Sequence, residues 1–180
     1  ADSKSPPGFA GNDATRAGDL LESAVIRHAI EVLKPSFFAE QHEAVAEQEF
    51  ITATLDAIAI IDGERCVIEA KTGGICSPLN GDGWGEPGTD EIPEHYMVQV
   101  QHQLYVAGKE YQFAAVSALI PPRGFCLYYV PRDEVLINAI VERELAFWFH
   151  VQTDTPPDDS VPSMDAIKRR RREPNKVVEV

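Results

Sequence analysis

Three residues whose side chains could carry out hydrolysis stand close together in the sequence: Asp56, Glu69 and Lys71. The runs around them are rich in β-branched and small apolar residues, and the Asp62-Gly63 pair between the runs is typical of a two-residue β-hairpin turn. With that turn, Asp56 lies opposite Glu69 and Thr54 lies opposite Lys71. Directly opposed residues share a face, with Cβ atoms about 4.5–5.5 Å apart. A two-residue turn therefore predicts two carboxylates and a lysine together at one end of the hairpin.

Such a group favours a divalent metal ion. Apolar residues occupy both faces of the expected hairpin, with Ile58, Ile60 and Val67 on the face of the acids and Ala57, Ala59, Ile61, Cys66, Ile68 and Ala70 on the other. Two carboxylates at the edge of a core repel each other unless a cation lies between them. Carboxylate oxygens suit Mg²⁺ or Mn²⁺, and a lysine beside the metal can activate a water or stabilise charge on a phosphate. The alternative is a structural salt bridge between Lys71 and one of the acids.

A second polar cluster lies on an expected helix from Pro93 to about Gly108, where proline fits the first turn. Helical spacing places its tyrosines and glutamines on two faces: Tyr96, Gln99 and Gln103 on one, Gln101 and Tyr105 on the other. Glutamines among apolar residues can donate hydrogen bonds to phosphate or to a metal-bound water. The alternative is that they are solvent-facing positions of an amphipathic helix.

The remaining pattern predicts an α/β fold, a mixed central β-sheet flanked by helices on both faces. Further helices are expected at about 18–33 and 133–150, and strands at 50–55, 57–61, 66–68, 112–120 and 125–130, with a glycine-rich loop over 72–92. Apolar residues of the last helix are expected to point mostly inward: Val135, Ile137, Ile140, Val141, Leu145, Trp148 and Phe149. The predicted organisation is an N-terminal loop over 1–17, one domain over 18–153 and a flexible tail over 154–180.

Composition excludes several classes of protein. The chain has 180 residues, 44% hydrophobic and 25% charged, which is ordinary for a soluble globular domain with a tail. No apolar run reaches the roughly 18 residues of a membrane span. The start lacks Met and the apolar segment of a signal peptide, so a cropped or processed N-terminus is expected. Three cysteines without a CxxC pair argue against a disulfide framework or a four-cysteine metal site and fit a reducing cytoplasm.

Charge is distributed unevenly along the chain. Six of the 16 basic residues follow residue 167, so residues 1–167 carry 10 basic and 27 acidic residues, a net charge of −17. A body this acidic repels nucleic acid at long range unless its acids are screened or neutralised by metal. The basic run Lys168–Arg172 is open to several interpretations: phosphate binding through counterion release, a partner-binding or localisation signal, or a solvated tail.

Other signals are weak. The Gly83–Gly88 segment matches G-x-G-x-x-G, but no strand directly precedes it and a proline within it disfavours a helix start, which argues against a dinucleotide site. Trp84 is expected to pack within its loop, with base stacking as the alternative. His42-Glu43 lacks the second histidine of a zinc-protease helix, and His95 and His102 are expected to be ordinary helix-surface residues.

Together these residues resemble the PD-(D/E)XK nuclease superfamily, and within it the group of YqaJ-like viral recombinases and phage lambda exonuclease. The resemblance covers about 18–155 and rests on three features: Glu22 after Gly18 on the first helix, the Asp56…Glu69-Ala70-Lys71 group, and the helix Ile92-Pro93-x-x-Tyr96-x-x-Gln99-x-Gln101-x-Gln103-Leu104. Ala57 stands where the family commonly has glycine, and the segment before the first helix is short. The resemblance implies a restriction-endonuclease-like core.

The resemblance also implies residue roles. Asp56, Glu69 and the Ala70 carbonyl would bind Mg²⁺, for which Mn²⁺ can substitute, and Glu22 would reach the metal directly or through water. Lys71 would position or activate the attacking water, and Gln99 would support the site. Contacts to DNA are expected from Gln101, Gln103, Tyr105, Tyr96 and Arg132.

The implied activity is metal-dependent hydrolysis of DNA phosphodiester bonds by an exonuclease, 5′-to-3′ on linear duplex ends, in phage-type recombination. The implied partners are DNA and a single-strand annealing protein in the cytoplasm of a bacterial host. A ring-shaped homo-oligomer fits the acidic body, because only its channel needs to be basic. Two alternatives stay open: an endonuclease or single-strand nuclease on the same core, and a non-catalytic DNA-binding module of the same fold.

Overall fold

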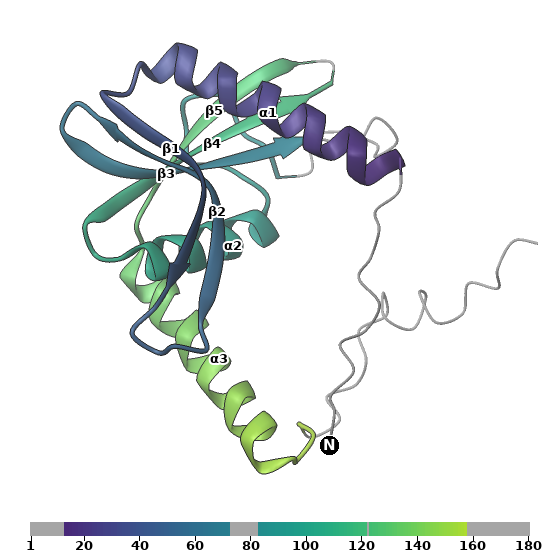
Figure 1. Ribbon diagram of the computed structural model, residues 1–180, viewed down its shortest axis with the longest axis vertical. Helices are drawn as coiled ribbons and strands as arrows, with labels where there is room; N and C mark the ends of the chain where they lie inside the picture. Colours follow the sequence, from purple (N-terminus) through teal and green to yellow (C-terminus); the bar gives the residue numbers. More distant parts are fainter. Residues whose placement is uncertain (1–12, 73–82, 122, 158–180) are drawn as a thin grey trace, which may run out of the picture. The chain divides into compact units, whose positions relative to one another are not determined.

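The computed structural model describes residues 13–72, 83–121 and 123–157 (Figure 1). The elements in these ranges are α1 (Asp13–Leu33), β1 (Phe37–Val45), β2 (Thr52–Ile61), β3 (Glu64–Thr72), α2 (Glu94–Ala107), β4 (Tyr111–Ile120), β5 (Gly124–Pro131) and α3 (Glu134–Thr153). Among the described helices, none is long and apolar enough to cross a membrane. Residues 73–82 of the expected loop, the start of the predicted N-terminal loop and the Lys168–Arg172 run lie outside the described residues.

The chain divides into two compact units, one up to Val141 and one from Glu142 onward. The first unit contains a five-stranded sheet in the order β1-β2-β3-β4-β5. Neighbouring strands are antiparallel except β3 and β4, which are parallel and are connected through α2. A parallel pair requires a crossover connection of this kind. The predicted α/β fold with a mixed sheet is confirmed, whereas the domain boundary at residue 153 stays a prediction.

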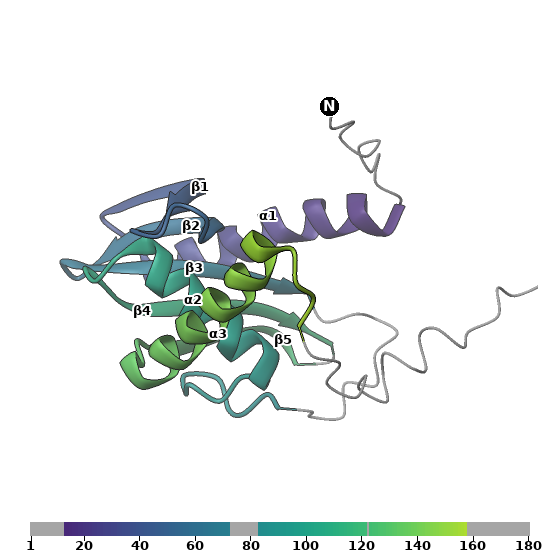
Figure 2. The ribbon, with the colours of Figure 1, turned by 90° about the horizontal axis from the view of Figure 1, so that it is seen from below.

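Helices cover both faces of this sheet, α1 on one side and α2 on the other (Figure 2). The core on the α2 side includes Val67 with Val100 and Leu104 of the helix, and Ile58 packs against it. The core under α1 includes the small residues of the other face, among them Ala57, Ala59, Cys66 and Ile68. The predicted distribution of side chains between the two faces of the hairpin is therefore correct.

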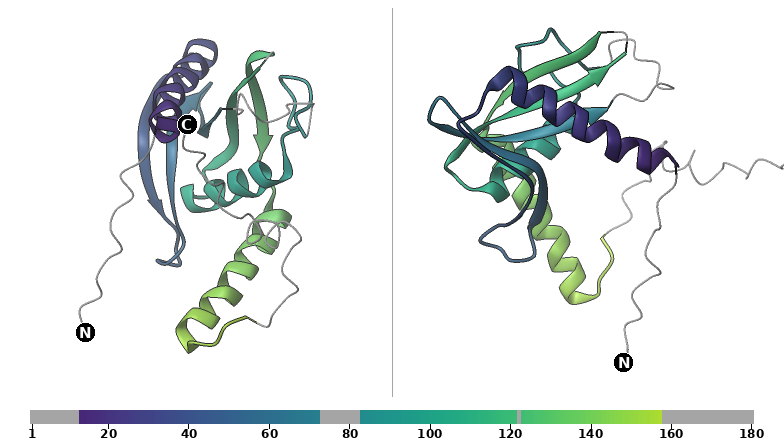
Figure 3. Two further views of the ribbon diagram at one scale, coloured as in Figure 1. Left: turned by 90° about the vertical axis from the view of Figure 1, so that its right-hand side faces the viewer. Right: turned by 45° about the horizontal axis from the view of Figure 1, so that its top comes forward.

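The hairpin turn has the predicted length, but the ladder beyond it is shorter than expected. Asp62 and Gly63 have φ angles of 51° and 87°, and Ile61 pairs with Glu64. The β2–β3 ladder ends at the Ala57–Ile68 pair, so Asp56 does not pair with Glu69 as predicted, nor does Thr54 pair with Lys71. Twist accumulates along a long two-stranded hairpin, and β1 and β2 curve away together from the other strands (Figure 3). The strands separate where the acidic residues lie.

Three further expectations need correction. Strand β1 was not predicted, because its central residues Glu40–Glu43 are polar and lack the alternation that marks a half-buried strand. Helix α1 begins at Asp13, within the expected N-terminal loop. In α3 only part of the expected apolar set is inward: Ile137 is buried, but Val135 is 81% exposed, and Leu145 and Phe149 are exposed too.

Candidate active site

Glu69 on β3 is the most enclosed carboxylate among the described residues, with 1% of its surface exposed. Its side chain points toward α2, whose glutamines meet it. Oε1 accepts hydrogen bonds from Lys71 Nζ and, at 2.7 Å, from Gln99 Nε2. Oε2 accepts one from Gln103 Nε2 at 2.6 Å. These donors replace the water that a buried carboxylate would otherwise need, so the charge of Glu69 is held in one orientation.

Lys71 lies two residues along β3, on the same face of the strand. Its ammonium bonds to Glu69 and donates to Gln99 Oε1 at 2.9 Å. It also lies 4.8 Å from the centroid of the Tyr96 ring, a favourable cation–π distance. The predicted face of the glutamine helix therefore exists: Tyr96, Gln99 and Gln103 all meet the Glu-x-Lys pair. A salt bridge is present, as the alternative interpretation expected, but it is one contact in a larger polar network.

Asp56 reaches the same region from β2, at the point where β2 leaves β3. Its Oδ2 accepts a hydrogen bond of 2.8 Å from the Ala70 backbone N–H, which has lost its ladder partner. Burial raises the pKa of Asp56 from 3.8 to about 7, with the charge of Glu69 and, less strongly, of Glu22 adding to the rise. The Ala70 N–H and the charge of Lys71 act in the opposite direction. Negative charge at Asp56 is thus costly without a further cation.

Glu22 approaches from α1 on the other side of the strands. Its Oε1 accepts a hydrogen bond of 2.9 Å from Gln41 Nε2 of β1. Sequence analysis did not identify Gln41, because it is an exposed polar residue in a strand that was not predicted. The structure brings Glu22, Glu69 and Lys71 close enough to Asp56 for the charge of each to affect its pKa.

The carboxylate oxygens of Asp56 and Glu69 that are not fully used as hydrogen-bond acceptors fit a hard divalent cation. Each carboxylate oxygen has two acceptor sites, so Glu69 Oε1 is filled by two donors and Oε2 retains one site. Asp56 Oδ1 receives no hydrogen bond from the described part of the chain. Over residues 13–72, 83–121 and 123–157, no three His, Cys, Asp or Glu side chains gather closely enough to hold a metal ion together. A metal ion at this position would have Asp56 and Glu69 as its direct carboxylate ligands, and Glu22 would act at longer range, through water.

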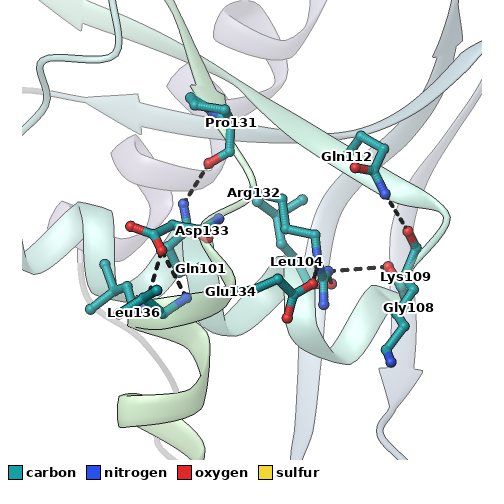
Figure 4. Close-up of polar contacts among 11 residues, drawn as sticks. Gln101, Leu104, Gly108, Lys109, Gln112, Pro131, Arg132, Asp133, Glu134 and Leu136 are labelled. Carbon is teal, nitrogen blue, oxygen red and sulfur yellow. Dashed lines mark hydrogen bonds and ion pairs between the residues drawn. The ribbon is translucent and has the colours of Figure 1, made fainter.

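Three of the five residues expected to contact DNA are committed to other partners (Figure 4 shows two of them). Gln101 is 1% exposed, donates to Pro131 O at 2.8 Å and accepts from the Asp133 N–H at 2.9 Å. The Arg132 side chain is 4% exposed, and its guanidinium donates to Leu104 O in the last turn of α2 and to Gly108 O just after the helix, at 2.5 and 3.3 Å. Tyr105 bonds to Gln48. These contacts argue against a DNA-binding role, because the polar atoms are already occupied within the fold.

We expect Arg132→Ala to lower the free energy of unfolding by about 1–3 kcal/mol, since the carbonyls at the end of α2 lose a charged donor. Arg65→Ala is the matched control: Arg65 is half-exposed in a surface pair with Glu110 and should change stability by less than about 0.5 kcal/mol. Urea unfolding measures both. An Arg132 variant of normal stability but weakened DNA affinity would restore the role first expected.

Gln103 is also unavailable to DNA, at 3% exposure, but it lies in the site. Its Nε2 holds Glu69, while its Oε1 is buried without a partner among the described residues. We expect the isosteric Gln103→Met to lower the free energy of unfolding by about 1–3 kcal/mol, because Glu69 Oε2 loses its donor. The same change at Gln112, an exposed glutamine on β4, is the control and should be nearly neutral. Equal effects at the two positions would argue against this role of Gln103.

Trp84 packs within its loop, as expected. Its ring centroid lies 5.6 Å from that of Tyr96 and 4.9 Å from that of Tyr128, and it contacts the core on the α2 side. Arg123 donates to Gly85 O at 2.8 Å, which fixes the following residue. This aromatic cluster supports Tyr96, the residue beside Lys71.

A mixed sheet with Asp56, Glu69 and Lys71 where β2 and β3 separate is the combination of fold class and residue group that the sequence predicted. Residues 11–110 match the YqaJ-like viral recombinase domain, and the chain belongs to that family. It is 34% identical over 140 residues to the uncharacterized protein YqaJ of Bacillus subtilis (strain 168). The match covers 76% of this chain and 41% of the Bacillus protein, so the chain spans less than half of that relative's length.

The fold is also found in a solved structure. The alkaline exonuclease LHK-Exo from Laribacter hongkongensis superimposes with a TM-score of 0.62, over 89% of this chain and 75% of the exonuclease. Sequence identity in that comparison is 17%, so what the two proteins are shown to share is the fold. The family and the fold class predicted from the sequence are confirmed.

Proposed function

We propose that this protein is a metal-dependent deoxyribonuclease whose site consists of Asp56, Glu69 and Lys71. The observation that carries the proposal is the crowding of two carboxylates beside one lysine, with the pKa of Asp56 raised to about 7 by burial and by the neighbouring acids. Such crowding is typical of functional sites, where a bound cation offsets the repulsion. Membership of a viral recombinase family and the fold of an alkaline exonuclease support DNA as the substrate.

Each residue has a distinct task in this proposal. Asp56 and Glu69, with the carbonyl of Ala70, would hold Mg²⁺ or Mn²⁺, and Glu22 would add negative charge through water. A bound divalent ion supplies Lewis-acid polarisation of the phosphate and lowers the pKa of water. Lys71 Nζ orients the attacking water and offsets charge on the phosphate oxygens. Gln99 and Gln103 keep the Glu69 carboxylate oriented.

For the reaction type we propose exonuclease action, 5′-to-3′ on linear duplex ends, in phage-type recombination within a bacterial cytoplasm. The support is the family to which the chain belongs and the exonuclease whose fold it shares. A single-strand annealing protein is the proposed partner, because 5′-strand removal leaves a 3′ overhang that such a protein binds. A ring-shaped homo-oligomer is proposed on the acidic charge of the chain, −13 overall, which favours enclosed over open-surface binding.

The test uses linear duplex DNA labelled separately at each 5′ and 3′ end, together with closed circular DNA, in Mg²⁺ and in EDTA. We expect Mg²⁺-dependent release of mononucleotides from the 5′ label, with circles intact. Cleavage of the closed circles would show that the protein is an endonuclease and not an exonuclease. Absence of any cleavage in Mg²⁺ or Mn²⁺ would contradict catalysis and leave the non-catalytic DNA-binding module.

A further inference from the structure

Gln41 has a backbone conformation that glutamine rarely adopts. Its φ angle is 52°, in the left-handed region, within the otherwise extended strand β1. The flanking pairs Glu40–Ala57 and His42–Leu55 keep one register, while the pair between them, Gln41 with Asp56, is missing from the ladder. The distortion therefore lies directly across from the candidate metal ligand on β2.

Because of this distortion, Asp56 lacks a paired residue on β1 as well as on β3. On the other edge of β2 the ladder with β3 ends at Ala57–Ile68, one residue before Asp56. Asp56 thus lies at an interruption of both ladders. Uncommon backbone conformations of this kind persist where the surrounding structure imposes them, and they cluster at functional sites.

The side chain of Gln41 contacts another acidic residue of the candidate site, Glu22. Its Nε2 donates to Glu22 Oε1 at 2.9 Å, which ties α1 to β1 across the site. The amide of Gln41 is neutral, so it orients the Glu22 carboxylate without neutralising its charge. A lysine or arginine in its place would neutralise that charge. Glu22 therefore keeps its negative charge, and the residue that holds it lies opposite Asp56 between the β1–β2 pairs Glu40–Ala57 and His42–Leu55.

We propose that Gln41 is a positioning residue that orients Glu22 toward the metal site from strand β1. This inference rests on the proposed function, since it assigns Gln41 a role in the same site. Residues that orient metal-binding carboxylates typically change metal affinity by 10- to 100-fold when they are replaced. Because this contact is exposed and Glu22 acts through water, we expect the lower end of that range.

The test is a calorimetric titration of Mg²⁺ into the whole chain without DNA. Gln41→Asn keeps an amide and tolerates the left-handed backbone, but its side chain is one methylene too short to reach Glu22. Gln41→Gly keeps the backbone conformation and removes the amide. Glu22→Gln and the double variant with Gln41→Asn close a mutant cycle. Gln112→Asn, the same substitution at an exposed glutamine of β4, is the matched control.

We expect both Gln41 variants to weaken Mg²⁺ binding about tenfold. The double variant should bind no more weakly than Glu22→Gln alone, and Gln112→Asn should bind as the wild type does. Wild-type affinity in both Gln41 variants, or fully additive losses in the double variant, would overturn the inference while the proposed function stands. A wild-type protein that neither binds Mg²⁺ nor cleaves DNA would overturn both. Thermal melting of every variant is the control for whether it is folded.

Discussion

Lys71→Ala is expected to reduce DNA cleavage at least about a thousandfold at saturating Mg²⁺, because the proposed site loses the group assigned to orient the water and offset phosphate charge. The fold should survive, since Glu69 keeps the two amide donors of Gln99 and Gln103. Initial rates on linear duplex DNA give the effect, and the thermal unfolding midpoint shows that the variant is folded.

Lys109→Ala provides the matched control for this prediction. Lys109 is an exposed lysine after α2, so its removal changes the net charge equally without touching the site. We expect wild-type cleavage from this variant. A folded Lys71→Ala protein that cleaves at a rate close to that of the wild type would exclude Lys71 from the mechanism.

Asp56→Asn is expected to stabilise the metal-free protein at pH 8. A carboxyl whose pKa rises from 3.8 to about 7 on folding destabilises the folded state progressively between about pH 4 and pH 7, and fully above that range. Asparagine removes the charge and keeps an oxygen that can accept the Ala70 N–H. After allowance for partial solvent screening, the gain is about 1–2 kcal/mol, or several degrees in the unfolding midpoint.

The pH dependence supplies the control for Asp56→Asn. At about pH 3 and below, Asp56 is mostly protonated in both states and the two proteins should unfold at nearly the same temperature. Melting curves in EDTA from about pH 3 to pH 8 measure the difference. A variant less stable than the wild type at pH 8 would show that the charge of Asp56 is well compensated without metal.

Much of the site could be predicted because it depends on short-range geometry. The Asp62-Gly63 turn fixes the hairpin register, since its two positive φ angles fit a two-residue turn. Helical spacing correctly grouped Tyr96 with Gln99 and Gln103. Both predictions concern residues within a few positions of one another, where backbone geometry alone decides which side chains meet.

The parts that were not predicted depend on long-range packing. Continuing the hairpin register to Asp56 and Glu69 fails because twist separates the strands, although the two acids still converge through the Ala70 N–H. Arg132 and Gln101 have side chains typical of DNA contacts, yet the end of α2 and the start of α3 occupy them. Nothing local in the sequence distinguishes a buried structural arginine from one that binds phosphate.

The central claim is that Asp56 and Glu69 form a site that needs a divalent cation. The measurement that tests it most directly is calorimetric titration of Mg²⁺ into the wild-type protein and into Asp56→Asn at pH 8. We expect saturable binding by the wild type and at least about tenfold weaker binding by the variant, because one of the two carboxylate ligands is lost. Equal affinity in the two proteins, or no binding by the wild type, would contradict the account.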